Sequence, residues 1–141
     1  MSLKDQVVLV TGSSGGIGDA AVSAFKAAGA VVIGADRSPK EDQSLEAFYP
    51  LDITSEQQCA AIVQDIKARF GRIDALVHAA GVLGTTPDIM ETTTEEFDSI
   101  LRINASATFS MVRETAKSML ESGTAGAIVV LSSVAAKESR L

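Results

Sequence analysis

The sequence predicts an α/β protein with a doubly wound parallel sheet. Strand-like and helix-like stretches alternate along the chain, and such alternation favours right-handed crossovers between parallel strands. Residues 73–79 and 127–131 are nearly continuous hydrophobic runs, as expected of strands covered on both faces by helices. A glycine-rich stretch, residues 12–18, joins the first strand to the first helix. We expect one domain over residues 1–141, long enough to bury a sizeable core.

Hydrophobic periodicity gives the order of the elements. Strands are expected near residues 6–11, 30–35, 47–51, 73–79 and 126–132, and helices near residues 16–28, 55–70 and 94–121. Thr54 or Ser55 is expected to cap the second helix, and Gly71 is expected to end it. Thr93 followed by Glu96 has the pattern of a capping box at the start of the third helix.

The glycine-rich stretch has the composition of a turn that binds a diphosphate. Gly12 would allow a tight turn, Gly16 would let the backbone approach a ligand, and Gly18 would let the next helix pack closely. Backbone N–H groups and the positive end of a helix dipole would then face the diphosphate. Ser14 could donate to a phosphate, although serine is also common in turns that bind no ligand.

Asp36 stands at the end of the second hydrophobic run. A carboxylate there can accept hydrogen bonds from both ribose hydroxyls of an adenosine, and it would repel a 2′-phosphate. Arg37 argues in the opposite direction, because a guanidinium binds phosphate well. We give Asp36 the greater weight and expect an adenosine with a free 2′-hydroxyl rather than a 2′-phosphate. The polar residues 37–43 that follow are expected to form a surface loop.

The glycine-rich stretch resembles the nucleotide-binding motif of the short-chain dehydrogenase/reductase family. The family's threonine-glycine-x-x-x-glycine-x-glycine spacing is matched by Thr11, Gly12, Gly16, Ile17 and Gly18. Further matches follow in the family's order: Asp36, then Asp52 and Ile53, then Ala80 and Gly81, then Asn104, and then Ser132 and Ser133. The resemblance implies a Rossmann fold in which the motif glycines, Asp36, the segment at Asp52 and the backbone at Ala80 contact the cofactor.

The resemblance also implies hydride transfer between a nicotinamide ring and the carbon of a secondary alcohol or carbonyl. Ser133 matches the family's substrate-orienting serine, with Ser132 as the alternative, and Asn104 matches the asparagine that supports a water chain. The family's catalytic tyrosine and lysine would follow Ser133, but the chain ends at Leu141 and its one tyrosine, Tyr49, precedes the third strand. We therefore expect a sheet truncated after the fifth strand, from either a longer enzyme or a naturally short chain without turnover.

Three functions stay open at this point. The first is an NAD-dependent dehydrogenase or reductase, which would be a homodimer or homotetramer when full length, as the resemblance implies. The second is a 3-oxoacyl thioester reductase, which Asp36 disfavours because that activity usually uses NADP. The third is a cofactor-binding module without catalysis. The residues fix neither the alcohol or carbonyl substrate nor the direction of the reaction.

Composition argues against several other classes of protein. The net charge is −6 and the basic residues are scattered, so neither nucleic acid nor an anionic membrane is an expected partner. No apolar stretch approaches the ~20 residues of a membrane-spanning helix.

The single cysteine, Cys59, and single histidine, His78, cannot form a zinc-ligand cluster, so no metal is expected. Cys59 is expected in the core, and His78 is expected to bond backbone between strands. One thiol and the absence of an apolar leader favour the cytoplasm.

Overall fold

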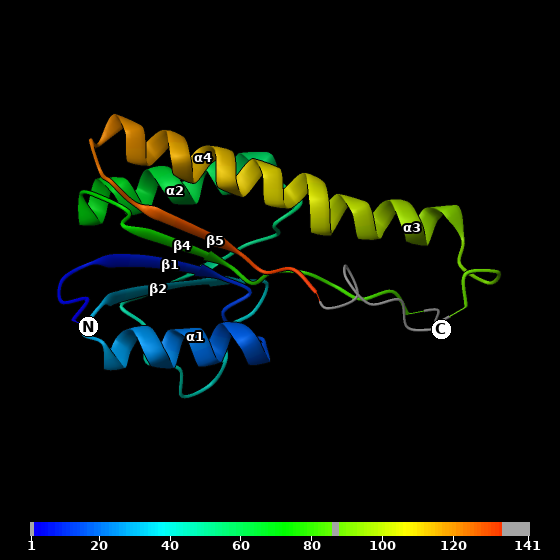
Figure 1. Cartoon of the computed structure of the whole chain (residues 1–141), viewed down its shortest axis with the longest axis horizontal. Helices are drawn as coiled ribbons and strands as arrows, with labels where there is room; N and C mark the ends of the chain where they lie inside the picture. Colours follow the sequence, from blue (N-terminus) through cyan, green and yellow to red (C-terminus); the bar gives the residue numbers. More distant parts are fainter. Residues whose placement is uncertain (1, 86–87, 134–141) are drawn as a thin grey trace.

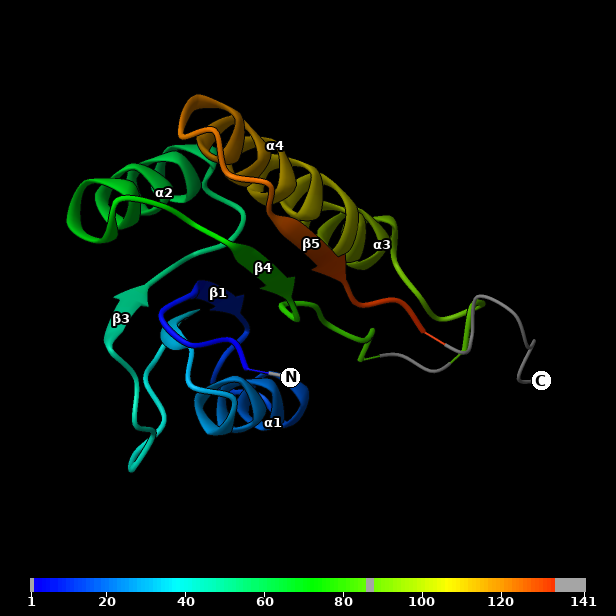
Figure 2. The ribbon, with the colours of Figure 1, turned by 60° about the vertical axis from the view of Figure 1, so that its left-hand side comes forward.

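The computed structural model describes residues 2–85 and 88–133. The elements are β1 (Val7–Thr11), α1 (Gly16–Ala27), β2 (Val31–Asp36), β3 (Ala47–Pro50), α2 (Glu56–Phe70), β4 (Ala75–His78), α3 (Thr94–Leu101), the π-helical turn η1 (Arg102–Ser106), α4 (Ala107–Glu121) and β5 (Ala127–Val130). The strands form one parallel sheet in the order β3-β2-β1-β4-β5, with β3 and β5 at its edges (Figure 2). This is the predicted Rossmann fold.

The direction of winding reverses at β1. In the register of the sheet, Thr11 at the end of β1 lies opposite Ala35 of β2 on one side and His78 of β4 on the other. The carboxyl ends of these strands therefore reach the same edge of the sheet. The connections that leave β1 and β4 run to opposite faces, so a crevice is expected between them at this edge.

Helices cover both faces of the sheet. Figure 1 shows α1 on one face and α2 with α4 on the other. Side chains of β1 alternate between the two layers, so Leu9 packs in the core with Ile66 of α2 and Met111 of α4. Val10 packs in the second core with Val22 of α1. A strand buried on both faces needs apolar residues at every position, which explains the continuous run at residues 7–10.

The expected helix signals stand where the sequence places them. Ser55 caps α2, since its Oγ accepts from Gln58 N at 3.3 Å, and Gly71 ends that helix with φ +81°. At the start of α3, Thr93 Oγ1 accepts from Glu96 N at 3.1 Å. The segment between β2 and β3 contains no helix, as its polar sequence predicts.

The helix expected at residues 94–121 is interrupted. It forms one continuous rod in Figure 1, but the turn at Arg102–Ser106 is π-helical and separates α3 from α4. A π turn takes up an extra residue and shifts the faces of the two flanking segments relative to each other. The segments on either side each keep a helical spacing of apolar residues, so the interruption was not predicted.

The last strand differs from the expectation that helices cover both its faces. β5 pairs with β4 and lies at the edge of the sheet. Val129 is 53% exposed and Val130 is 44% exposed. Among the described residues α4 packs chiefly on α2, and its contacts with β4 and β5 are fewer.

Candidate functional site

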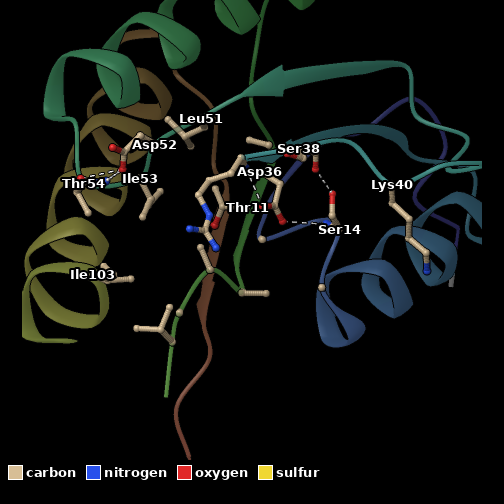
Figure 3. Close-up of a pocket in the computed structure, with 18 of the residues that line it drawn as sticks. Thr11, Ser14, Asp36, Ser38, Lys40, Leu51, Asp52, Ile53, Thr54 and Ile103 are labelled. Atoms are coloured by element: carbon tan, nitrogen blue, oxygen red, sulfur yellow. Dashed lines mark hydrogen bonds between the residues drawn. The ribbon is translucent and has the colours of Figure 1, made fainter. Parts of the chain in front are cut away.

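A cavity of about 610 Å³ opens at the carboxyl edge of the sheet. Its volume is in the range of small-molecule sites. The ends of four strands and the loops that follow them supply its wall (Figure 3): Thr11, Gly12, Ser14, Gly15, Ala35, Asp36, Arg37, Ser38, Pro39, Lys40, Leu51, Asp52, Ile53, Thr54, Ala79, Ala80, Gly81 and Val82, with Ile103 from η1. The site therefore lies where the doubly wound topology predicts it.

Two of the motif glycines are required by close backbone packing. Gly12 has φ +69°, and a Cβ on it would lie 2.6 Å from Ala80 N. A Cβ on Gly18 would lie 2.0 Å from Gly12 O, so the first turn of α1 presses against the glycine turn itself. A Cβ on Gly16 would meet nothing within 4 Å, which leaves the backbone there open to a ligand.

Asp36 lies at the centre of the wall. Its Oδ2 accepts from Ser14 N at 3.0 Å and its Oδ1 accepts from Arg37 N at 2.7 Å (Figure 3). Each carboxylate oxygen has a second lone pair, so Asp36 can accept two further hydrogen bonds. The Ser14 hydroxyl donates to Ser38 O at 2.7 Å. In this conformation it anchors the loop after β2 rather than reaching toward a phosphate.

Asp52 organises the opposite side of the cavity. Its Oδ1 accepts from both the backbone N and the hydroxyl of Thr54, at 3.0 and 2.8 Å. The hydrogen bond from the Thr54 hydroxyl is the main reason that the pKa of Asp52 lies below its usual value. The carboxylate is therefore ionised at neutral pH, and Ile53 beside it adds an apolar surface to the wall.

The segment after β4 is held from behind by Asn104. The Asn104 Oδ1 accepts from Val82 N at 2.9 Å, and its Nδ2 donates to Val82 O at 2.8 Å. A Cβ on Gly81 would lie 3.2 Å from Asn104 Oδ1. Ala80 and Gly81 line the cavity, whereas Asn104 does not. Asn104 thus fixes the wall without contributing to its surface.

His78 is buried in the middle of a chain of hydroxyl contacts. Its exposure is 2%, its Nδ1 is 2.8 Å from Thr11 Oγ1, and its Nε2 is 3.0 Å from Thr108 Oγ1. The Thr108 hydroxyl donates its proton to Asn104 O at 2.9 Å, so Nε2 carries a hydrogen and donates to Thr108. The expected structural role fits this arrangement, but the expected backbone partner was wrong. Burial lowers the pKa of His78, so the ring is neutral near pH 7.

The structure places the remaining predicted site residues outside the cavity wall. Gly16, Ile17 and Gly18 open α1, and Ile17 is 65% exposed. Ser132 and Ser133 follow the carboxyl end of β5 and are exposed at the same edge of the sheet. The cofactor and catalytic roles of these residues stay predictions.

Several residues of the wall were not predicted from the sequence. They include Ala35, Ser38, Pro39, Lys40, Leu51, Thr54, Val82 and Ile103. They come from separate elements and loops with no shared motif, and only the sheet order brings them together. A signal was available for Lys40, because the polar loop after Asp36 had to pass close to the adenosine end of the predicted site.

Other reactive side chains lie away from the cavity. The Tyr49 hydroxyl donates to Asp65 at 2.5 Å and accepts from Arg69 at 2.9 Å, and burial is the main reason that the pKa of Tyr49 is raised. Cys59 is buried in the core, and burial raises its pKa to about 11.

Within residues 2–85 and 88–133, no group of three or more candidate metal ligands occurs. No helix in that part of the chain has the length and apolarity to cross a membrane.

Comparisons with known proteins agree with this geometry. The family model described as short chain dehydrogenase matches residues 6–141. D-threitol dehydrogenase of Mycolicibacterium smegmatis is 37% identical over 95% of this chain and 55% of its own length. The mitochondrial (-)-isopiperitenol/(-)-carveol dehydrogenase of Mentha piperita is 30% identical over 93% of this chain and 53% of its own length.

Solved structures give the same result. The NAD+-bound short chain dehydrogenase from Leptospira borgpetersenii superposes with a TM-score of 0.91 at 26% identity, over 99% of this chain and 56% of that one. The chain thus spans about half the length of the curated relatives it matches. Because the family model runs through the whole sheet and the curated relatives align along nearly the whole chain, this protein belongs to the short-chain dehydrogenase/reductase family.

Proposed function

We propose that the chain binds NAD in the cavity and forms the cofactor-binding part of an oxidoreductase that acts on a secondary alcohol or a carbonyl compound. One observation carries this proposal: the glycine turn before α1 and the carboxylate of Asp36 line the same cavity. The family supports it. So do the relatives named for D-threitol, carveol and xylitol, each of which carries a secondary hydroxyl group, and the NAD+ bound in two similar structures.

The residues present fit such a cofactor. The N–H groups of Gly16, Ile17 and Gly18 in the first turn of α1 would hold the pyrophosphate. Those of Gly12, Ser14 and Gly15 already donate within the protein and shape the turn. Asp36 would accept from the ribose hydroxyls, Asp52 and Ile53 would border the adenine, and the backbone of Ala80 and Gly81 would line the far side. When bound, the nicotinamide ring gives or accepts the hydride.

The charge at Asp36 favours NAD over NADP. A 2′-phosphate would stand beside a carboxylate that two backbone N–H groups already hold in place. Like charges at hydrogen-bonding distance oppose binding, whereas a 2′-hydroxyl can donate to the same carboxylate. Arg37 lies in the same wall and offsets part of this repulsion.

For the reaction itself, we assign substrate orientation to Ser133 and a supporting role to Asn104. Transfer of a proton to or from the substrate oxygen needs a group whose pKa is tuned toward neutrality. Tyr49 does not fit, because its pKa is raised and its hydroxyl is bonded to Asp65 and Arg69, away from the cavity. We therefore propose that turnover belongs to a full-length protein that carries the family's tyrosine and lysine.

The engagement of Tyr49 also favours a second candidate function for the chain as it stands, a cofactor-binding module without turnover. The two candidates differ in one measurement. A module would bind the dinucleotide without reducing it in the presence of secondary alcohols.

For the full-length enzyme we propose a homodimer or homotetramer, since Phe97 and Phe109 on α3 and α4 are 55% and 62% exposed.

Calorimetric titration with NAD and NADP tests the binding proposal. The wild-type chain is expected to bind NAD more tightly than NADP. Asp36→Ala is expected to weaken the binding of NAD by about tenfold or more, because hydrogen bonds to a charged acceptor are lost. The ratio of the affinity for NAD to that for NADP should therefore fall. Asp36→Asn keeps one acceptor and should lie between the two. If neither dinucleotide produces heat with the wild type, the proposed function is wrong.

A further inference from the structure

We propose that Asp19 draws Lys40 away from the cofactor cavity and thereby lowers the affinity of that cavity for a dinucleotide that carries a 2′-phosphate. Asp19 would be a specificity-determining residue that acts through Lys40. The inference rests on the proposed function, because it concerns which nicotinamide dinucleotide the same cavity prefers.

The loop after β2 brings two cationic side chains to the cavity wall. Arg37 and Lys40 follow Asp36 and line the cavity with it. A phosphate on the ribose that Asp36 is expected to hold would therefore lie close to both cations. Their combined charge would offset the repulsion from Asp36, if both were available to the phosphate.

Lys40 is not available in this structure, because it forms an ion pair with α1. Its Nζ is 2.5 Å from Asp19 Oδ2. In Figure 3 the ammonium group of Lys40 points away from Asp36. An ammonium group paired with a carboxylate presents little net charge to a third group. Of the two cations, only Arg37 forms no ion pair among the described residues and keeps its full charge available to a 2′-phosphate.

The Asp19 carboxylate is held in place from its other side. Its Oδ1 accepts from Gln43 Nε2 at 2.9 Å, and the same Gln43 nitrogen donates to Ser13 O at 2.8 Å. The hydrogen bond from Lys40 is the main reason that the pKa of Asp19 lies below its usual value. Asp19 therefore stays ionised at neutral pH and keeps its hold on Lys40.

The position of the loop does not depend on this ion pair alone. The Ser14 hydroxyl donates to Ser38 O at 2.7 Å, and Lys26 Nζ donates to Ser44 Oγ at 2.6 Å. Neutralising Asp19 should therefore release Lys40 without moving the loop that forms this part of the cavity wall. Lys40 and Asp19 are 48% and 30% exposed, and exposed ion pairs are weak, so the expected effect is a shift of a few-fold rather than a reversal of preference.

The test measures dissociation constants for NAD and NADP by calorimetry at low salt. Asp19→Asn removes the charge but keeps an oxygen that can accept from Gln43. It is expected to lower the dissociation constant for NADP by about two- to fivefold and to change that for NAD by less than about twofold. The gain should shrink as salt is raised, because salt screens an exposed lysine and a phosphate.

Two further variants separate the release of Lys40 from a general change of charge. In Lys40→Met the affinity for NADP should barely change, because the ammonium is already occupied, whereas Asp19→Asn combined with Lys40→Met should lose the gain. Glu41→Gln is the matched control. It also removes one negative charge, but from the loop that carries Lys40, where Glu41 is exposed and forms no ion pair among the described residues.

The outcomes are distinguishable. An NADP gain in Asp19→Asn that disappears with Lys40→Met supports the proposal. Three results would overturn it and leave the proposed function intact. The affinity for NADP could rise equally in Glu41→Gln, or its rise in Asp19→Asn could survive the addition of Lys40→Met. It could also stay unchanged in Asp19→Asn while the wild type still binds NAD. Absence of binding of either dinucleotide to the wild type overturns the proposed function, and this inference with it.

Discussion

Gly16 and Gly18 stand two positions apart in the motif, yet their surroundings differ. A Cβ on Gly18 would lie 2.0 Å from a backbone oxygen, whereas one on Gly16 would meet nothing within 4 Å. We expect Gly18→Ala to lower the free energy of unfolding by about 2–3 kcal/mol, because the backbone of the turn must shift. Gly16→Ala should change it by less than about 1 kcal/mol. Urea denaturation without cofactor measures both.

The same pair of variants separates packing from ligand approach. Gly16→Ala should leave a stable fold that binds NAD more weakly, because the added methyl group would occupy the space left for the pyrophosphate. Equal losses of stability in the two variants would contradict the assignment of Gly18 to packing. Unchanged NAD affinity in Gly16→Ala would contradict the assignment of Gly16 to the ligand.

Residues in motifs could be predicted from the sequence, and residues that act through space could not. Gly12 and Asp36 were identified because a tight turn and a strand-end carboxylate have recognisable chemistry. The partners of His78 were not, since Thr11 and Thr108 lie 67 and 30 residues away from it. Thr54 and Ile103 reach the cavity wall only because the sheet order brings their loops together.

At the scale of elements, the π turn between α3 and α4 holds one segment of the cavity wall, the one that follows β4. It carries Asn104, whose amide forms two hydrogen bonds with the backbone of Val82 at the end of the β4 segment. The periodicity of apolar residues predicted the helix around this turn and the strand before it. It could not predict the turn, because one extra residue leaves the amphipathic pattern readable on both sides.

We expect Asn104→Ala to lower the free energy of unfolding by about 1–2 kcal/mol, because two hydrogen bonds are lost. The amide hydrogen of Val82 should then exchange faster with solvent. Asn104→Asp keeps an acceptor for Val82 N but lacks the donor to Val82 O, so its exchange rate should be intermediate. Hydrogen exchange followed by NMR measures this order. An unchanged Val82 rate in Asn104→Ala would contradict the anchoring role.

At the scale of the whole molecule, alternation along the chain was enough to predict the sheet, its direction and the edge at which the cavity opens. The exposure of β5 was not predictable in this way. A hydrophobic run indicates that a strand can be covered, whereas the actual cover depends on which elements pack over it. For the described residues the sheet has its core at β1, where both neighbouring strands and both helical layers meet.

His78 connects these layers, since it joins β4 to β1 and to α4. Burial lowers its pKa in the folded state below the ordinary value of 6.5. Between the folded and unfolded pKa values the unfolded chain binds more protons, so the free energy of unfolding should fall as the pH is lowered from about 7 toward 5. One proton limits this slope to about 1.4 kcal/mol per pH unit.

Urea denaturation at a series of pH values measures the slope, with His78→Gln as the control. His78 is the only histidine in the chain, and the carboxyl groups with lowered pKa values, Asp19, Asp52 and Glu121, titrate below this window. Their stabilising contribution is present above their ordinary pKa values, 3.8 for the aspartates and 4.5 for Glu121, and is lost as the pH falls below them. The variant is expected to be less stable at pH 7 and nearly flat between pH 5 and 7. A slope that persists in His78→Gln would place the pH dependence elsewhere, and a flat wild type would mean that the folded protein accepts a charged ring between Thr11 and Thr108.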